Sequence, residues 1–139
     1  MLKQEAKEAI LETIRPIPIV EALGIHIDEL DEGYCRATVP HNRRYDGIYR
    51  SYHGGLLTTV ADSIACFAIM TQTGPEQPMT TTDLNIRFLA ACRSDVTAEA
   101  KVIKIGRTLC PVGVELFDTN KTKVAVAQVT YMRLSKAPG

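Results

Sequence analysis

The residues best suited to chemistry in this chain are His53, Gly54, Gly55 and Asp62, which stand at the start of one apolar stretch or inside it. Adjacent glycines let another group approach the backbone closely, and the first turn of a helix has unpaired N–H groups with a partial positive charge. Asp62 is the only charged residue between Gly55 and Met70, and a buried acid is costly unless it is paired. Acyl transfer needs such an oxyanion donor together with a base or nucleophile.

Each of these residues alone also fits a purely structural role. His53 is typical of a helix cap, the two glycines of a tight turn, and Asp62 of a buried acid bonded to the backbone or to a threonine. The hypothesis of an active site therefore rests on their combination.

Other catalytic devices are absent from the sequence. It has no Gly-x-Ser-x-Gly elbow and no glycine-rich phosphate loop. The histidines His26, His41 and His53 are isolated, and no Cys/His cluster has metal-ligand spacing. We therefore expect no metal site.

The spacing of the two candidate groups predicts a composite site. Gly54 and Asp62 are eight residues apart, or about 12 Å along a helix axis at ~1.5 Å per residue. One carbonyl cannot contact both groups in one chain. If both act on one substrate, Gly54 of one subunit works with Asp62 of another, and the enzyme is at least a two-fold dimer.

The elements expected to position these residues are two helices and six strands. Residues 2–14 predict an amphipathic helix that ends before Pro16 and Pro18, with a short turn of helix at 19–23. Residues 25–30 and 35–39 predict a hairpin, and 55–70 a helix that is apolar on nearly every side. Four β-rich segments follow at 79–89, 96–105, 108–117 and 123–134. This order predicts an α+β fold in which an antiparallel sheet wraps around one long helix.

The length and composition of the chain limit the class of protein to which it can belong. The 139 residues predict a single domain (1–139) with an N-terminal helical extension at 1–18. Lysine and arginine number 16 and balance 16 acids, which argues against a general nucleic-acid or anionic-membrane binder. The four cysteines are far apart, the first residues lack a secretory pattern, and no run reaches the ~20 apolar residues of a membrane span. We therefore expect a cytoplasmic protein.

Residues 41–52 are the longest irregular stretch, and they are rich in arginine and tyrosine. Long loops are often functional, although a solvated loop with a few packed tyrosines fits equally well.

Several motifs together resemble the hot-dog-fold acyl-CoA thioesterases of the PaaI-like, phenylacetate-degradation type. The resemblance spans residues 24–134. It rests on His53-Gly54-Gly55 with an acid nine positions after the histidine, on Thr81-Thr82-Asp83-Leu84-Asn85-Ile86-Arg87-Phe88-Leu89, on Gly106-Arg107, and on Ala127-Gln128-Val129-Thr130-Tyr131.

The resemblance implies hydrolysis of an acyl-CoA thioester. The Gly54 N–H would polarise the carbonyl, and Asp62 of the partner subunit would activate water or attack directly. His53 would help to place the substrate. Thr81 would hold the water, with Thr82 as its rival, because consecutive strand residues face opposite ways.

The resemblance also implies where the rest of the substrate binds. Gly55 would line the site, and the CoA phosphates would meet the turns around Arg93 and Arg107-Thr108. No cofactor is expected beyond the CoA of the substrate. The family further implies a dimer of dimers.

One departure from the family concerns the irregular loop. Relatives often have Asn six residues before the histidine and Gly three before it, where this chain has Gly47 and Arg50. Asp46 or Ser51 would have to replace the amide, or the loop is rearranged.

Two other functions stay open at this point. A non-catalytic acyl-CoA-binding or sensing domain would bind ligand without turnover, although the retained acid argues against it. A hot-dog hydratase or dehydratase would need a histidine opposite an acid for proton transfer to carbon, and the motif order fits this poorly.

Overall fold

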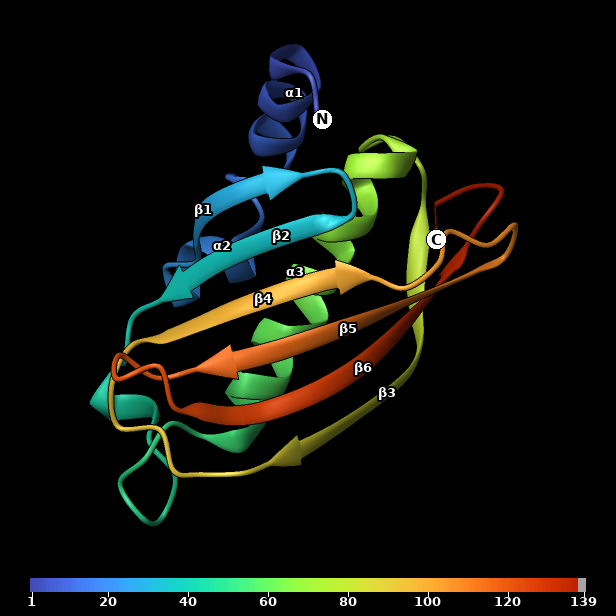
Figure 1. Cartoon of the computed structure of the whole chain (residues 1–139). Helices are drawn as coiled ribbons and strands as arrows, with labels where there is room; N and C mark the ends of the chain where they lie inside the picture. Colours follow the sequence, from blue (N-terminus) through green and yellow to red (C-terminus); the bar gives the residue numbers. More distant parts are fainter. Residues whose placement is uncertain (138–139) are drawn as a thin grey trace.

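A computed structural model describes residues 1–137 and contains one antiparallel sheet curved around a long helix (Figure 1). The helix is α3 (Gly54–Thr73), and the strand order across the sheet is β1-β2-β4-β5-β6-β3. The strands are β1 (His26–Asp31), β2 (Tyr34–Val39), β3 (Met79–Phe88), β4 (Val96–Val102), β5 (Leu109–Phe117) and β6 (Lys123–Arg133). The predicted α+β arrangement is confirmed.

Three shorter helical elements complete the chain. They are α1 (Gln4–Ile14), α2 (Pro18–Leu23) and the 3-10 turn η1 (Arg43–Tyr45). The amphipathic pattern of α1 buries Ile10 and Ile14 against the core. Pro18 occupies the first turn of α2, where no N–H needs an acceptor, and Gly24 ends this helix at φ 70°.

The core lies between the concave face of the sheet and α3. Strand β5 alternates as its sequence predicts, with Cys110, Val112, Val114 and Leu116 fully buried. The apolar run in β6 suits its interior place in the sheet, between β5 and β3. Helix α3 has the length and mean hydropathy (1.5) of a membrane span, but here it is the core helix of the domain.

Strand β4 ends earlier than its sequence indicates. The β-rich pattern runs to residue 105, but the strand stops at Val102. The Gly106 N–H donates to the Leu109 carbonyl (3.0 Å), and a Cβ at Gly106 would collide with that same oxygen. Only glycine fits this turn, and the close approach depends on a contact that the sequence pattern does not reveal.

The expectation that α3 is buried on nearly every side is wrong for one stripe. Residues at helical spacing on this stripe remain half-exposed, namely Thr59, Asp62, Ser63, Cys66 and Met70. The six-stranded sheet curves around only part of the helix, and α1 packs against another part of it. The stripe leaves Asp62 within reach of solvent or of a second chain.

Burial of Cys35 predicts a pH dependence of stability. This thiol is fully buried, and burial raises its pKa to about 12. The native state then favours the protonated thiol more than the unfolded state does. The resulting stability is present below the unfolded pKa of 9.0 and is lost as pH rises towards 12. We expect the free energy of unfolding in urea to fall from pH 9 upward, with a shallower slope in Cys35→Ala. An identical slope in both proteins would contradict this role of Cys35.

Candidate active site

Of the two glycine N–H groups at the N-terminus of α3, one donates a hydrogen bond within the chain and the other does not. The Gly55 N–H donates to His53 Nδ1 at 2.9 Å, which makes His53 the N-cap residue. The Gly54 N–H meets no acceptor among residues 1–137. Of the two glycines, only Gly54 therefore has an N–H that is free to donate to an incoming oxygen, because the N–H of Gly55 serves the cap.

Each glycine makes room for a different ring. A Cβ on Gly55 would lie 3.0 Å from the His53 imidazole, and a Cβ on Gly54 would lie 3.1 Å from Phe88 Cζ. Phe88 is 53% exposed at the end of β3. The paired glycines therefore admit the capping imidazole on one side and the Phe88 ring on the other.

The cap also fixes where the neutral His53 ring carries its proton. Since Nδ1 accepts from Gly55, the hydrogen of the neutral ring is on Nε2. His53 is exposed, so this second donor is accessible beside the free Gly54 N–H.

Asp62 is held by two hydroxyl groups. Thr81 Oγ1 donates to Asp62 Oδ1 at 2.7 Å, and the Tyr131 hydroxyl donates to the Asp62 main-chain oxygen at 2.8 Å. Thr81 and Tyr131 are partners across β3 and β6. The pairing register shifts between Thr81 and Asp83, which leaves Thr82 at a bulge without a bond to Asp62. Of the two rival threonines, Thr81 is the one that reaches the acid.

Cys66 lies one helical turn beyond Asp62. Burial raises the pKa of this thiol to about 11, and burial also raises the pKa of Tyr131. Both groups stay protonated at neutral pH, so Asp62 has no competing thiolate nucleophile beside it.

The two halves of the site do not meet within one chain. A cavity of about 360 Å³ opens at Gly54 and is lined by Ser51, Tyr52, Gly54, Leu57, Phe88, Leu89, Ala90, Ala91 and Cys92. Asp62 is absent from this lining. It lies about 12 Å further along α3, at ~1.5 Å per residue.

The loop before α3 has its own internal contacts. Asp46 Oδ1 lies 2.6 Å from His41 Nε2, and its side chain is only 10% exposed. The Asp46 carboxylate is therefore engaged by His41, whereas Ser51 lines the cavity at Gly54. Of the two residues considered as replacements for the family's amide, Ser51 is the one beside the candidate donor.

Arg93 and Arg107, the two arginines predicted to meet the CoA phosphates, lie at opposite ends of β4 in one chain. Arg93 lies in the loop before β4, and Arg107 with Thr108 lies in the turn after β4. At ~3.3 Å per residue, the seven residues of β4 separate the two turns by about 20 Å. Both arginines are exposed.

The arrangement matches a known family. The model of the thioesterase superfamily matches residues 50–125, which include the helix entrance, Asp62 and Thr81. This chain is a member of the thioesterase superfamily. It is accordingly a thioester hydrolase.

Solved structures of similar proteins identify the fold of this thioesterase. The Escherichia coli PaaI protein, from the phenylacetic acid degradation operon, aligns with a TM-score of 0.88 at 23% identity, over 99% of each chain. The hot-dog fold is thereby confirmed. A Saccharolobus solfataricus protein named only as a candidate esterase is 27% identical over 122 residues, which is 87% of this chain and 81% of its own length. Mouse acyl-coenzyme A thioesterase 13 is 37% identical over 73 residues, which is 50% of this chain and 49% of its own length.

Some contacts of the candidate site residues cannot be predicted from the sequence alone. Tyr131 was part of a recognised motif, but its contact with Asp62 follows only from the pairing of β3 with β6. Phe88 stood in another motif without any assigned contact to Gly54. The pairing of His41 with Asp46 has no signal beyond the density of polar residues in that loop.

His53 provides a test that separates capping from substrate contact. Asn is a good N-cap residue, so His53→Asn should keep the bond from Gly55 and the urea stability to within a few tenths of a kcal/mol, whereas His53→Ala should lose about 1 kcal/mol. Both variants remove the Nε2 donor, and we expect both to lose roughly ten-fold in kcat/KM. Full activity in His53→Asn would mean that the histidine acts only as a cap.

Proposed function

We propose that this thioesterase hydrolyses acyl-CoA thioesters at a site made from the α3 entrance of one subunit and Asp62 of its partner. The observation that carries the proposal is the pair formed by an unused Gly54 N–H and a hydroxyl-bonded Asp62 on the open stripe of α3. The N–H and the helix dipole suit a developing oxyanion, and the carboxylate suits a base or nucleophile.

The chemistry follows from these two groups. The thioester carbonyl accepts from the Gly54 N–H, and the His53 Nε2–H supplies a second donor to the substrate. Asp62 of the partner takes a proton from water as the water oxygen bonds to the carbonyl carbon. The C–S bond then breaks, and the proton held by Asp62 passes to the departing sulfur, so that CoA leaves as its thiol and the acyl group as its acid. In the alternative route, the Asp62 carboxylate attacks the carbonyl carbon and the C–S bond breaks, which releases CoA as its thiolate and leaves an anhydride with Asp62. Water then hydrolyses this anhydride to the free acid and restores Asp62. Neither route needs a metal or a cofactor beyond the CoA of the substrate.

Three features support the dimer that this mechanism requires. The two groups are about 12 Å apart in one chain. The stripe of α3 that carries Asp62 is half-exposed. Strand β3 is a ten-residue strand at the edge of the sheet, with a free backbone edge for a two-fold partner. Antiparallel pairing of two β3 strands would reverse one helix relative to the other and bring each Asp62 towards the partner's Gly54. A dimer of dimers in the cytoplasm remains our expectation.

The direct test is release of free thiol from aromatic, short-chain and long-chain acyl-CoAs, run beside the Asp62→Asn variant. Turnover of at least one class, lost in the variant, is the expected result. Binding without turnover in every class would instead favour an acyl-CoA sensor. Hydration of an enoyl-CoA without thiol release would favour a hydratase.

The two threonines differ in their expected effects. Thr81→Val keeps the shape of the side chain but removes the hydroxyl that donates to Asp62, and we expect kcat to fall about ten-fold or more. Thr82→Val at the bulge should have a smaller effect, and Thr81→Ser should restore most of the activity. The measurement is kcat with an acyl-CoA that the wild type hydrolyses. An equal loss of kcat in Thr81→Val and Thr82→Val would contradict the proposed role of Thr81.

A further inference from the structure

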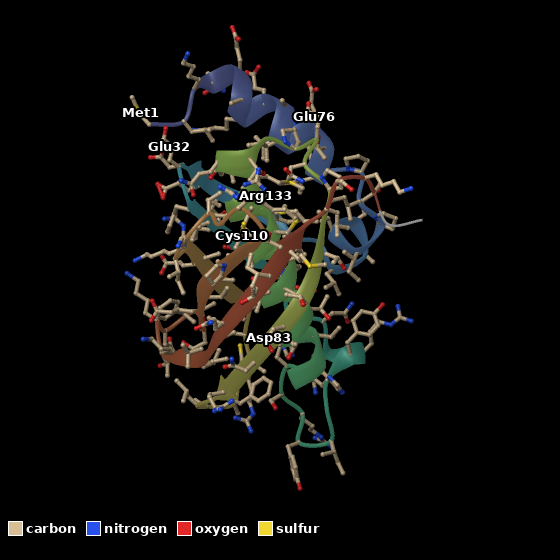
Figure 2. All side chains as sticks on the ribbon, turned by 90° about the vertical axis from the view of Figure 1, so that its right-hand side faces the viewer. Met1, Glu32, Glu76, Asp83, Cys110 and Arg133 are labelled. Atoms are coloured by element: carbon tan, nitrogen blue, oxygen red, sulfur yellow. The ribbon has the colours of Figure 1, made fainter. Side chains whose placement is uncertain are left out.

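A second cavity, of about 190 Å³, lies between the end of α2, the segment 40–46 and the first turn of α3, and the proposed hydrolysis does not use it. Figures 1 and 2 show α2 (blue) and η1 (teal) on the same side of the molecule. Tyr52 lines both this cavity and the one at Gly54, but Gly54 is absent from the second lining. The two cavities are therefore separate and share Tyr52 as a wall. We call the second one the α2 cavity.

The lining of the α2 cavity contains two nearly buried polar side chains that pair with each other. The side chains of His41 and Asp46 are only 15% and 10% exposed, and His41 Nε2 lies 2.6 Å from Asp46 Oδ1. Both residues line the cavity. A carboxylate only accepts hydrogen bonds, so Nε2 carries a hydrogen, and Nδ1 of the neutral ring is then an acceptor.

Each member of this pair keeps one atom without a partner. Within residues 1–137, Asp46 Oδ2 and His41 Nδ1 make no hydrogen bond. Neither atom is sealed from solvent, because every fully buried side-chain nitrogen or oxygen in that part of the chain has a partner. Both atoms are therefore reachable from the cavity that their residues line. A nearly buried carboxylate is costly unless its oxygens find donors, so a ligand with N–H groups would be stabilised here.

The end of α2 adds further acceptors to the same cavity. The last carbonyl groups of a helix have no partner within it and carry a partial negative charge. The carbonyls of Ala22 and Leu23 accept no backbone hydrogen bond within residues 1–137, and both residues line the cavity. The α2 side of the cavity therefore also favours a positively charged donor.

Apart from the imidazole, the charged side chains in the lining are both acidic. They belong to Glu21 and Asp46, and within residues 1–137 the lining contains no lysine or arginine. The Arg44 guanidinium lies over the Tyr45 ring, 5.8 Å from its centroid, but Arg44 does not line the cavity. Donors in the lining are the Asn42 amide and the Tyr45 hydroxyl, and both residues are exposed. An anion would thus find two carboxylates and no guanidinium or ammonium group.

We propose that the α2 cavity binds a small primary ammonium ion. An ammonium group has three donors and no acceptor, which matches the unpartnered atoms of His41 and Asp46 and the free carbonyls of α2. The carboxylates compensate its charge through charge-assisted hydrogen bonds, and the Tyr52 ring offers its alkyl part an apolar wall. The volume of 190 Å³ is below the ~300–1,000 Å³ of drug-sized sites, so the ligand has only a few heavy atoms.

Two other occupants fit the cavity less well. A bare metal ion would need a cluster of ligands, and residues 1–137 contain no group of three His, Cys, Asp or Glu that could hold one. The cavity is also far larger than the ~10–15 Å³ that a single water occupies. An acyl chain, in turn, would cover the acceptors of the lining without offering them a donor.

The test is an NMR titration with n-propylammonium chloride that follows the amide resonances of Gly24, Asn42 and Leu56, all of which line the cavity. We expect saturable shifts at these amides. 1-Propanol has the same heavy-atom skeleton without the charge, and potassium chloride supplies a monovalent cation without N–H donors. Neither should reproduce the shifts at the same concentration.

Two variants remove the acidic groups one at a time. Asp46→Asn keeps an oxygen for the His41 Nε2–H but replaces the free carboxylate oxygen with a donor, and the affinity should fall at least ~ten-fold. Glu21→Gln changes an exposed carboxylate and should cost about three-fold. Asp28→Asn is the matched control: it makes the same change in the His26–Asp28 pair (3.0 Å), which is absent from this lining, and should leave the affinity unchanged.

The titration needs no turnover, so its result holds whether or not the chain hydrolyses an acyl-CoA. Shifts that rise linearly without saturation would overturn the inference, and so would equal saturation by 1-propanol or by potassium chloride. Unchanged affinity in both Asp46→Asn and Glu21→Gln would also overturn it. If Asp46→Asn does not fold, unchanged affinity in Glu21→Gln is enough to reject the site.

Discussion

Asp62→Asn should abolish most thioester hydrolysis while the protein stays folded and assembled. General acid or base catalysis by a positioned side chain is worth roughly 100- to 10,000-fold, and a nucleophilic carboxylate would be missed at least as much. Asparagine retains an oxygen in the place of Asp62 Oδ1, so Thr81 keeps an acceptor for its hydroxyl. We therefore expect kcat to fall at least ~100-fold, with little change in urea stability.

The control for this loss lies next to Asp62 on the same stripe. Ser63 is also half-exposed, and its hydroxyl donates to the Thr59 carbonyl one turn back (2.8 Å). Ser63→Ala removes a hydrogen bond of α3 without removing a carboxylate, and we expect near-normal kcat. Comparable activity in Asp62→Asn and Ser63→Ala would show that the acid is a structural residue whose partner is Thr81.

The part of the fold that the sequence could predict depends on repeated patterns. In β5, alternate residues from Cys110 to Leu116 face the core, so a period of two is visible in the sequence itself. The length of α3 follows likewise from an uninterrupted apolar run. Both features can be predicted without knowing which other segments pack against the strand or the helix.

Contacts between distant segments were not available from such patterns. Thr81 and Asp62 are 19 residues apart, and only the place of β3 beside α3 brings them to 2.7 Å. Spacing alone left Thr81 and Thr82 as rivals, and the bulge after Thr81 separates their environments. The exposed stripe of α3 was hidden for a similar reason, because hydrophobicity does not tell which side of a helix the sheet leaves open.

The two residues that depart from the family pattern, Gly47 and Arg50, both lie in the loop that the Asp46–Tyr52 bridge closes before α3. The carboxylate of Asp46 is engaged by His41, so the missing amide is not simply replaced by the nearest acid. Arg50 has φ 56° at the position where the family resemblance leads us to expect glycine, and the sequence cannot show that the backbone keeps a positive φ there.

Complementation between two inactive variants should restore activity if each site is shared by two chains. Gly54→Pro removes the proposed oxyanion donor, a loss of roughly 100- to 1,000-fold, at the first position of α3, where proline is tolerated. His53 has φ −60° and ψ 129°, which suits a residue before proline, and the exposed Phe88 ring has room to yield. Alone, Gly54→Pro and Asp62→Asn should both be nearly inactive.

A mixed dimer of these two variants contains one site with neither substitution. The Gly54 of the Asp62→Asn chain lies opposite the Asp62 of the Gly54→Pro chain, and the second site carries both losses. After co-expression and purification through two different tags, we expect about half of the wild-type turnover per dimer. A control assembly of Asp62→Asn with the double variant Gly54→Pro/Asp62→Asn has no intact site and should remain inactive. If both groups acted within one chain, every site of the mixed dimer would carry a substitution. An inactive mixed dimer would therefore show that Gly54 and Asp62 of the same subunit act together, despite the ~12 Å between them.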